Sequence, residues 1–133
     1  MLGSVDFKDN VVIADLEAGI GTLTRLGDER VDTVLVVVEP TPKSIEVGTR
    51  AAAIVSEKNL GRVIVVASRV RGDADVATIQ AAMPGVEVVA IPDDPAIVQA
   101  DRRGIAPLDA SPDSPAVKAL VALAESLLEP AAA

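Results

Sequence analysis

The chain has 133 residues, half of them apolar, and a net charge of −8 from 20 acidic and 12 basic residues. This length indicates one domain, able to bury roughly two thirds of the surface of its unfolded chain. The acidic balance disfavours nucleic acid as a direct partner, because it repels a phosphate backbone. With neither Cys nor His, disulfides, thiolate nucleophiles and the usual zinc, nickel or iron–sulfur sites are excluded. Mg²⁺ on oxygen ligands is the simplest metal that remains.

The two ends of the sequence are expected to lie outside the fold. Residues 1–10 are interpreted as a lead-in without the basic start and apolar stretch of a secretory signal, which favours a cytoplasmic protein. The longest apolar runs are about five residues, far short of the roughly 20 that span a bilayer. We expect residues 11–129 to form a single α/β domain and residues 130–133 to fray.

Four apolar, β-branched stretches predict buried strands, because both faces of each stretch are apolar, as in parallel sheets covered on both sides. They are Val11–Ala14, Thr33–Val38, Arg62–Ala67 and Val86–Ile91. The first ends in Asp15 and a glycine-bearing loop, Asp15–Gly27. An aspartate in this place either caps the next helix or presents a carboxylate to a ligand.

Three short pairs predict helix starts, because each joins a capping side chain to a proline at the first helical position. They are Thr41-Pro42, Asp94-Pro95 and Ser114-Pro115. The helices are expected over about 42–59, 95–101 and 115–129, with a short helix over about 74–83. Six residues of the last helix form an apolar stripe at helical spacing: Val117, Leu120, Val121, Ala124, Leu127 and Leu128.

The alternation of strands and helices predicts an α/β fold, a parallel sheet of about four strands with right-handed crossovers and helices on both faces. Ligands bind at the carboxyl ends of such strands. The polar residues expected there are Asp15, Glu39, Ser68, and Asp93 or Asp94. Structural readings stay open for two of these places: Asp94 as a helix cap, and Ser68 with Arg69 as part of a solvated loop over 68–75.

Five stretches in order carry a resemblance to a known family. They are VVIADLEAGIGTL (11–23), VDTVLVVVEPTPKSIEVGTRAAAI (31–54), VIVVASRV (63–70), VVAIPDDPAIVQADRRGIAPLD (88–109) and SPDSPAVKALVALAESL (111–127). Together they resemble the second half of the MinD/ParA-type P-loop ATPases, most closely the nickel-insertion ATPases that mature carbon monoxide dehydrogenase. The resemblance implies a truncated, three-layer P-loop NTPase-like fold.

The resemblance also implies roles for six residues. Asp15 and Gly19 resemble the acid and the moving glycine of the switch II loop, with Asp15 reaching Mg²⁺ through a water when nucleotide binds. Ser68 and Arg69 stand where relatives have an Asn-Lys pair that reads the adenine edge. Pro92 and Asp94 resemble the loop beside the base. The implied cofactors are ATP or ADP with Mg²⁺.

The sequence also departs from the family. These 133 residues contain no G-x-x-x-x-G-K-[ST] phosphate-binding motif, Gly21-Thr22 replaces a Glu-His pair, and the family's metal-binding cysteines are missing. In relatives the P-loop strand lies between the strands equivalent to 11–14 and 33–38. We therefore expect Val11–Ala14 to close that gap, a partner chain to supply a strand, or two copies to associate.

The favoured interpretation is a P-loop-less relative that acts as a binding, regulatory or accessory partner, for example of a metallocentre-maturation ATPase, rather than as an enzyme. Its expected partners are a P-loop-containing ATPase or a second copy of the chain. A weak adenine-nucleotide-binding protein that uses Asp15, Ser68 and the 92–94 loop is one alternative. A receiver-like signalling domain, which would need a lysine after its last strand, is another. The product of an incomplete reading frame is a third.

Overall fold

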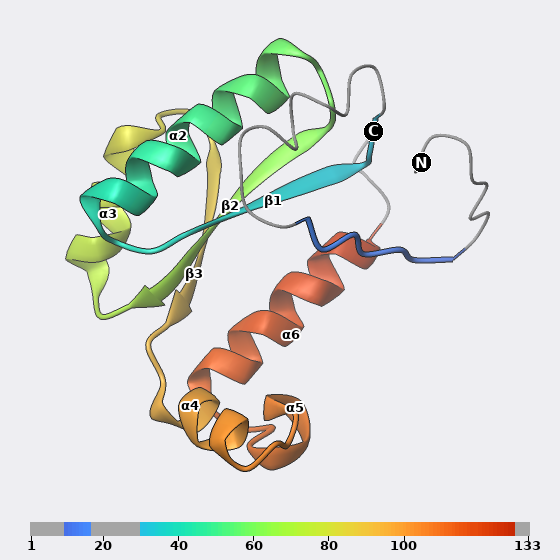
Figure 1. The fold of residues 1–133 in the computed structure, drawn as a ribbon, viewed down its shortest axis with the longest axis vertical. Coiled ribbons are helices and arrows are strands. Elements are labelled where there is room, and N and C mark those ends of the chain that lie inside the picture. Colours follow the sequence, from blue (N-terminus) through green and yellow to red (C-terminus); the bar gives the residue numbers. More distant parts are fainter. Residues whose placement is uncertain (1–9, 17–29, 130–133) are drawn as a thin grey trace.

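The structure, a computed structural model, describes residues 10–16 and 30–129. Its described helices and strands are β1 (Thr33–Val38), α2 (Pro42–Glu57), β2 (Arg62–Val70), α3 (Asp73–Ala82), β3 (Glu87–Pro92), α4 (Pro95–Arg102), α5 (Pro107–Ala110) and α6 (Pro115–Leu128). The three strands form one parallel sheet in the order β1-β2-β3. Helices α2 and α3 cover one face, and α6 lies on the other (Figure 1). The predicted α/β class is confirmed.

The sheet face under α2 and α3 holds the larger core cluster. Its buried members are Val36, Val38, Ala52, Val65, Ala67, Val70, Ile79 and Met83. Gly48 of α2 lies against β1, so close that an added Cβ would overlap Cγ2 of Val38. The glycine is therefore what lets this helix settle onto the strand.

The opposite face has a smaller buried cluster, made by Val66, Ile91, Ala116 and Leu123. Helix α6 packs against β3 and leaves the β1 side of this face uncovered by any described helix. The register places Leu35 beside Ile64 and Val37 beside Val66, so these β1 side chains point to the α6 face. Leu35 is 40% exposed and Val37 is 65% exposed.

All three predicted helix caps are confirmed. The backbone N–H of Ser44 donates to Oγ1 of Thr41 at 3.3 Å, that of Ala96 donates to Oδ1 of Asp94 at 3.0 Å, and that of Val117 donates to Oγ of Ser114 at 3.4 Å. Each cap is followed by a proline in the first turn. Local sequence alone therefore determines where these helices begin.

The expected first strand is not formed. Val11–Ala14 lies in the described segment 10–16, has no regular secondary structure, and is exposed throughout. β1 pairs with β2, and β2 pairs with β3, but segment 10–16 pairs with neither outer strand. The sheet of the described residues therefore has three strands rather than four.

Other boundaries differ by less. Helix α2 ends at Glu57, two residues early, and Asn59 takes a left-handed turn (φ 51°). β2 continues to Val70 instead of ending at Ala67, so Ser68 and Arg69 belong to the strand and not to a loop. The short α5 was not predicted.

Of the six residues in the predicted apolar stripe of α6, only Val117 is buried. The buried residues of this helix are Ala116, Val117 and Leu123, whereas Leu120, Val121, Leu127 and Leu128 are exposed. The helix contributes Ala116, Ala119 and Leu123 to the cluster on this face of the sheet. None of the described helices is long and apolar enough to cross a membrane.

Candidate functional site

The carboxyl ends of all three strands lie at one edge of the sheet, because the strands are parallel. Glu39 follows β1, Arg69 lies near the end of β2, and Asp93 follows β3. Together with Pro40, Thr41 and Arg71, these residues line an open hollow of about 250 Å³. We call the three charged residues Glu39, Arg69 and Asp93 the edge triad.

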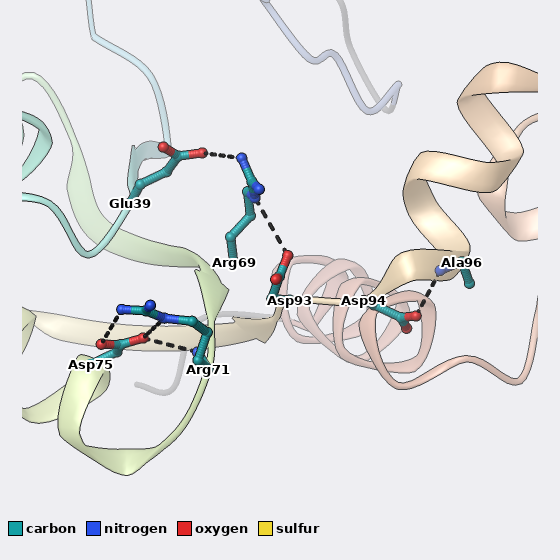
Figure 2. Close-up of polar contacts among 7 residues, drawn as sticks. All are labelled: Glu39, Arg69, Arg71, Asp75, Asp93, Asp94 and Ala96. Carbon is teal, nitrogen blue, oxygen red and sulfur yellow. Dashed lines mark hydrogen bonds and ion pairs between the residues drawn. The ribbon is translucent and has the colours of Figure 1, made fainter.

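The edge triad is joined by Arg69. Its Nη1 lies 3.5 Å from Oε1 of Glu39, and its Nε lies 3.4 Å from Oδ1 of Asp93. Figure 2 shows the guanidinium group between the two carboxylates. All three side chains are about half exposed or more, so these pairs contribute little to stability and remain accessible to a ligand.

A β-bulge aims Arg69 at the hollow. β2 pairs Ala67 with Ala90 and then Val70 with Pro92, which leaves one extra residue on β2 between the two pairs. Arg69 adopts a left-handed backbone conformation there (φ 58°), which costs free energy for any residue with a Cβ. The N–H of Asp93 donates to the carbonyl of Val70 at 2.9 Å and fixes the end of β3 against the bulge. Bulges often redirect a side chain beside a functional site.

Arg71 is held at the rim by the first turn of α3. Its Nε and backbone N–H donate to Oδ2 of Asp75 at 3.2 and 3.0 Å. The hydrogen bond and the charge of Asp75 raise the pKa of Arg71, and the hydrogen bonds from Arg71 lower the pKa of Asp75. Arg71 thus makes three hydrogen bonds to one carboxylate, whereas Arg69 makes one to each of two carboxylates.

Asp94 serves the fold and not the hollow. Its Oδ1 accepts from the N–H of Ala96 at the start of α4, and its Oδ2 accepts from the N–H of Ala116 in the first turn of α6, both at 3.0 Å. These hydrogen bonds, that of Ala116 first, lower the pKa of Asp94. In Figure 2 the carboxylate points away from Arg69. The helix-cap interpretation of Asp94 is the one that the geometry supports.

The other four sequence-predicted site residues are Ser68, Pro92, Asp15 and Gly19, and the three that the structure describes do not line the hollow. Ser68 lies half-buried in the bulge, and Pro92 is the last residue of β3. Neither is among the residues that line the hollow, although each adjoins one that is. Asp15 is exposed in segment 10–16 and does not line the hollow. Gly19 lies outside the described residues.

Three residues of the hollow, Pro40, Thr41 and Arg71, were not singled out from the sequence as site residues. Thr41 had been assigned only a capping role, and Arg71 had no signal of its own. Glu39 and Asp93 were expected at strand ends, but only the bulge in β2 shows that Arg69 joins them. Strand register is the information that sequence patterns lacked.

The donor set of the hollow suits an uncharged, hydrogen-bonding group. Glu39 and Asp93 flank Arg69, so a phosphate group beside Arg69 would meet two like charges, and with Arg71 the lining has two acidic and two basic side chains. Carboxylates accept hydrogen bonds from amines, and arginine planes stack on aromatic rings, so a purine base fits this chemistry. Among residues 10–16 and 30–129, no group of three or more Asp or Glu side chains is placed to hold a metal ion.

A second, larger hollow of about 510 Å³ lies between α4 and α5. Its lining residues are Ile97, Val98, Asp101, Gly104, Ile105, Ala106 and Pro107. Asp101 is the single ionisable side chain among them, so this groove offers little chemistry. Neither hollow is lined by a lysine, the residue type that the receiver-like alternative would need.

Comparison with known proteins gives partial matches. The chain is 32% identical over 123 residues to an uncharacterised ATP-binding protein of Methanocaldococcus jannaschii, which covers 89% of this chain and 46% of the relative. It is 28% identical over 106 residues to the carbon monoxide dehydrogenase accessory protein CooC of Rhodospirillum rubrum. This match covers 79% of this chain and 40% of CooC. A second uncharacterised ATP-binding protein of M. jannaschii is 35% identical over 66 residues. This match covers 50% of this chain and 26% of the relative.

The chain thus spans less than half the length of each of these curated relatives. No protein-family model matches it. The similarity is to ATP-binding proteins and to a carbon monoxide dehydrogenase accessory protein, and it agrees in part with the resemblance seen in the sequence.

Proposed function

We propose that the chain is an accessory partner of a MinD/ParA-type ATPase and provides the base side of a nucleotide site that a P-loop-bearing partner completes. The observation that carries the proposal is the unfinished side of the sheet, where a parallel strand edge and an apolar face lie open together. The similarity to ATP-binding proteins and to CooC supports the identity of the partner.

Both outer strands of the described sheet, β1 and β3, have one unpaired edge, and the β1 edge is the one beside the uncovered apolar side chains. Within the described ranges, β1 pairs with β2 on one side and with no strand on the other. Its backbone groups on the free side are available to another strand, and Val37 adds an exposed apolar side chain. Unpaired edges with apolar side chains are sites of strand addition.

The handedness of crossovers says where the helix of an added unit would lie. Both crossovers in the sheet, through α2 and α3, run from β1 toward β3 and lie on one face (Figure 1). A strand–helix unit that begins beside β1 and continues away from β2 has its helix on the opposite face, because crossovers are right-handed. That face carries Leu35 and Val37, with α6 beside them. The unit would cover them.

A phosphate-binding loop between that strand and helix would lie at the carboxyl edge, next to the edge triad. Such loops hold phosphates with successive backbone N–H groups. The partner then supplies the phosphate contacts, and Arg69 with Asp93 and Glu39 faces the base. In this arrangement neither chain has a complete site alone.

The proposal is tested by measuring whether this chain binds the P-loop-bearing half of a nickel-insertion ATPase. That half is expressed as a fragment that ends before the switch II strand. Titration calorimetry is expected to give a one-to-one complex, which Val37→Lys weakens roughly tenfold or more, because a charge replaces the apolar contact at the edge. Val98→Lys is the matched control, since Val98 is 47% exposed on α4, away from the edge. Absence of a complex, or equal losses in both variants, would contradict the proposal.

A second candidate is weak adenine-nucleotide binding by the chain alone, which the hollow and the two ATP-binding relatives favour. Because these 133 residues contain no G-x-x-x-x-G-K-[ST] motif, we expect phosphates to add little, since each charge-assisted hydrogen bond from such a loop contributes roughly 1.5–3 kcal/mol. Adenosine and Mg-ATP should therefore bind the isolated chain with similar, low affinity. Tight binding and hydrolysis of Mg-ATP by the chain alone would refute the accessory role.

A further inference from the structure

The chain contains a second unfinished element besides the β1 edge. Val11–Ala14 is β-branched and apolar, yet it forms no strand and is exposed, with Ile13 at 87%. An exposed stretch of this kind leaves apolar surface in water and its backbone without a sheet ladder. The sequence pattern of a buried strand and the exposure of these residues disagree, and neither the edge triad nor the partner interface accounts for the disagreement.

The two unfinished elements are complementary. The free edge of β1 offers backbone donors and acceptors, and Leu35 and Val37 extend its apolar surface. Val11–Ala14 offers a strand-forming backbone and two apolar faces of the kind that central parallel strands have. Pairing the two would give each backbone hydrogen-bond partners and would bury apolar side chains of both.

Direction and tether length permit their pairing within one chain. Figure 1 draws segment 10–16 running in the same sense across the view as β1, which is the sense that a parallel sheet requires. Residues 17–32 connect the two elements, and a parallel connection needs about a dozen residues or more. The segment can therefore join the sheet without reversing its direction.

We propose that Val11–Ala14 is a self-closing strand, which adds in parallel to the free edge of β1 and occludes that edge in the isolated chain. The inference rests on the proposed function, since the edge it occupies is the one assigned there to the P-loop-bearing partner. With Ala14 level with Val38, Asp15 would lie next to Glu39 at the carboxyl edge. Partner binding then requires the strand to leave β1, so the segment regulates access to the site.

Hydrogen exchange of the β1 amides tests the proposal without any partner. The amides of β1 that are not bonded to β2 should exchange roughly tenfold or more slowly in the wild type than in Ile13→Pro, because proline lacks the N–H and cannot continue a strand ladder. Ile13→Val is the matched control, since it keeps a β-branched side chain, and it should exchange like the wild type. Equal exchange in all three proteins overturns the proposal.

The dependence on protein concentration separates this strand from one supplied by a second copy. Protection by an intramolecular strand is unchanged on dilution, whereas protection that is lost on dilution assigns the edge to a second copy and overturns the proposal. Because the chain has no Cys, a disulfide gives an independent readout. Ile13→Cys with Val37→Cys should oxidise within the monomer. Leu108→Cys with Val37→Cys, which starts from an exposed residue of α5, should not.

The two proposals fail in different ways. If the β1 amides are unprotected but the P-loop half still binds, the self-closing strand is wrong and the accessory role stands. If the amides are protected and no P-loop half binds, the strand is a structural part of the sheet and the accessory role fails.

Discussion

The two faces of the sheet are built from the same strands but are finished to different degrees. Under α2 and α3, the side chains of Val36, Val38 and Val65 are buried, and a glycine lets α2 approach the strand closely. On the other face, α6 covers the β3 side and leaves Leu35 and Val37 exposed. The first face is a completed core. The second has the composition of a core and the exposure of a surface, which is the property of an interface.

The largest expected loss of stability comes from a substitution in the core between α2 and β1. Gly48→Ala should destabilise the protein by about 2–3 kcal/mol, although alanine favours helices, because the new methyl group overlaps Val38 and pushes α2 from the sheet. Urea unfolding measures the loss. Gly72→Ala is the control, since nothing lies within 4 Å of a Cβ there and its φ of 175° is ordinary extended backbone. A stabilised Gly48→Ala protein would show that α2 does not pack as described.

A pair of neighbouring substitutions compares the two faces directly. Val38→Ala removes two buried methyl groups and should cost about 2 kcal/mol through lost transfer free energy and the cavity left behind. Val37→Ala, one residue away on the other face, should cost about half as much or less, because no described helix covers Val37 and only the proposed edge strand would shield it. Equal losses in chemical denaturation would mean that the α6 face is as complete around Val37 as the other face is around Val38.

Asp94 anchors the unfinished face by joining the starts of α4 and α6. Its pKa in the folded chain lies below the unfolded value, so its contribution to stability is present above the unfolded pKa, near pH 4, and is lost as pH falls through the folded pKa. Asp94→Asn should lower the midpoint of thermal unfolding by several degrees at neutral pH. This difference should shrink as the pH drops below about 4.

Asp109→Asn, an exposed change of the same charge on α5, controls for net charge in that experiment. A difference between Asp94→Asn and wild type that stays constant down to acidic pH would show that the carboxylate charge of Asp94 is not what joins the helices.

The features of the fold that could be predicted from the sequence are those set by interactions between residues close together in the chain. Helix starts were predicted correctly at Thr41, Asp94 and Ser114, because a cap and its proline act over three residues. The parallel sheet was predictable from β-branched runs. The burial of α6 was not, because helical periodicity shows that a helix has an apolar stripe but not which flank of a wide stripe meets the sheet.

The candidate site was predictable only in part for the same reason. Strand ends placed Glu39 and Asp93 at one edge, but the bulge that brings Arg69 between them depends on pairing between β2 and β3. Asp94 was ambiguous because capping and ligand binding use the same carboxylate chemistry. For Val11–Ala14, the pattern indicates a strand and the described fold gives it no partner. Its neighbours decide its structure, and the sequence pattern does not name them.

The smallest expected effect on stability lies at the edge between the two faces. Arg69→Ala should change the free energy of unfolding by no more than about 0.5 kcal/mol, because exposed ion pairs at 3.4–3.5 Å contribute little. Arg69→Gly should be more stable than Arg69→Ala by up to about 1 kcal/mol, since glycine adopts the left-handed conformation without steric cost. Both variants should lose adenosine binding in calorimetry, which separates a ligand-facing arginine from a structural one. If instead both unfold easily, Arg69 holds the strand ends together, and the backbone cost at the bulge serves the fold rather than a ligand.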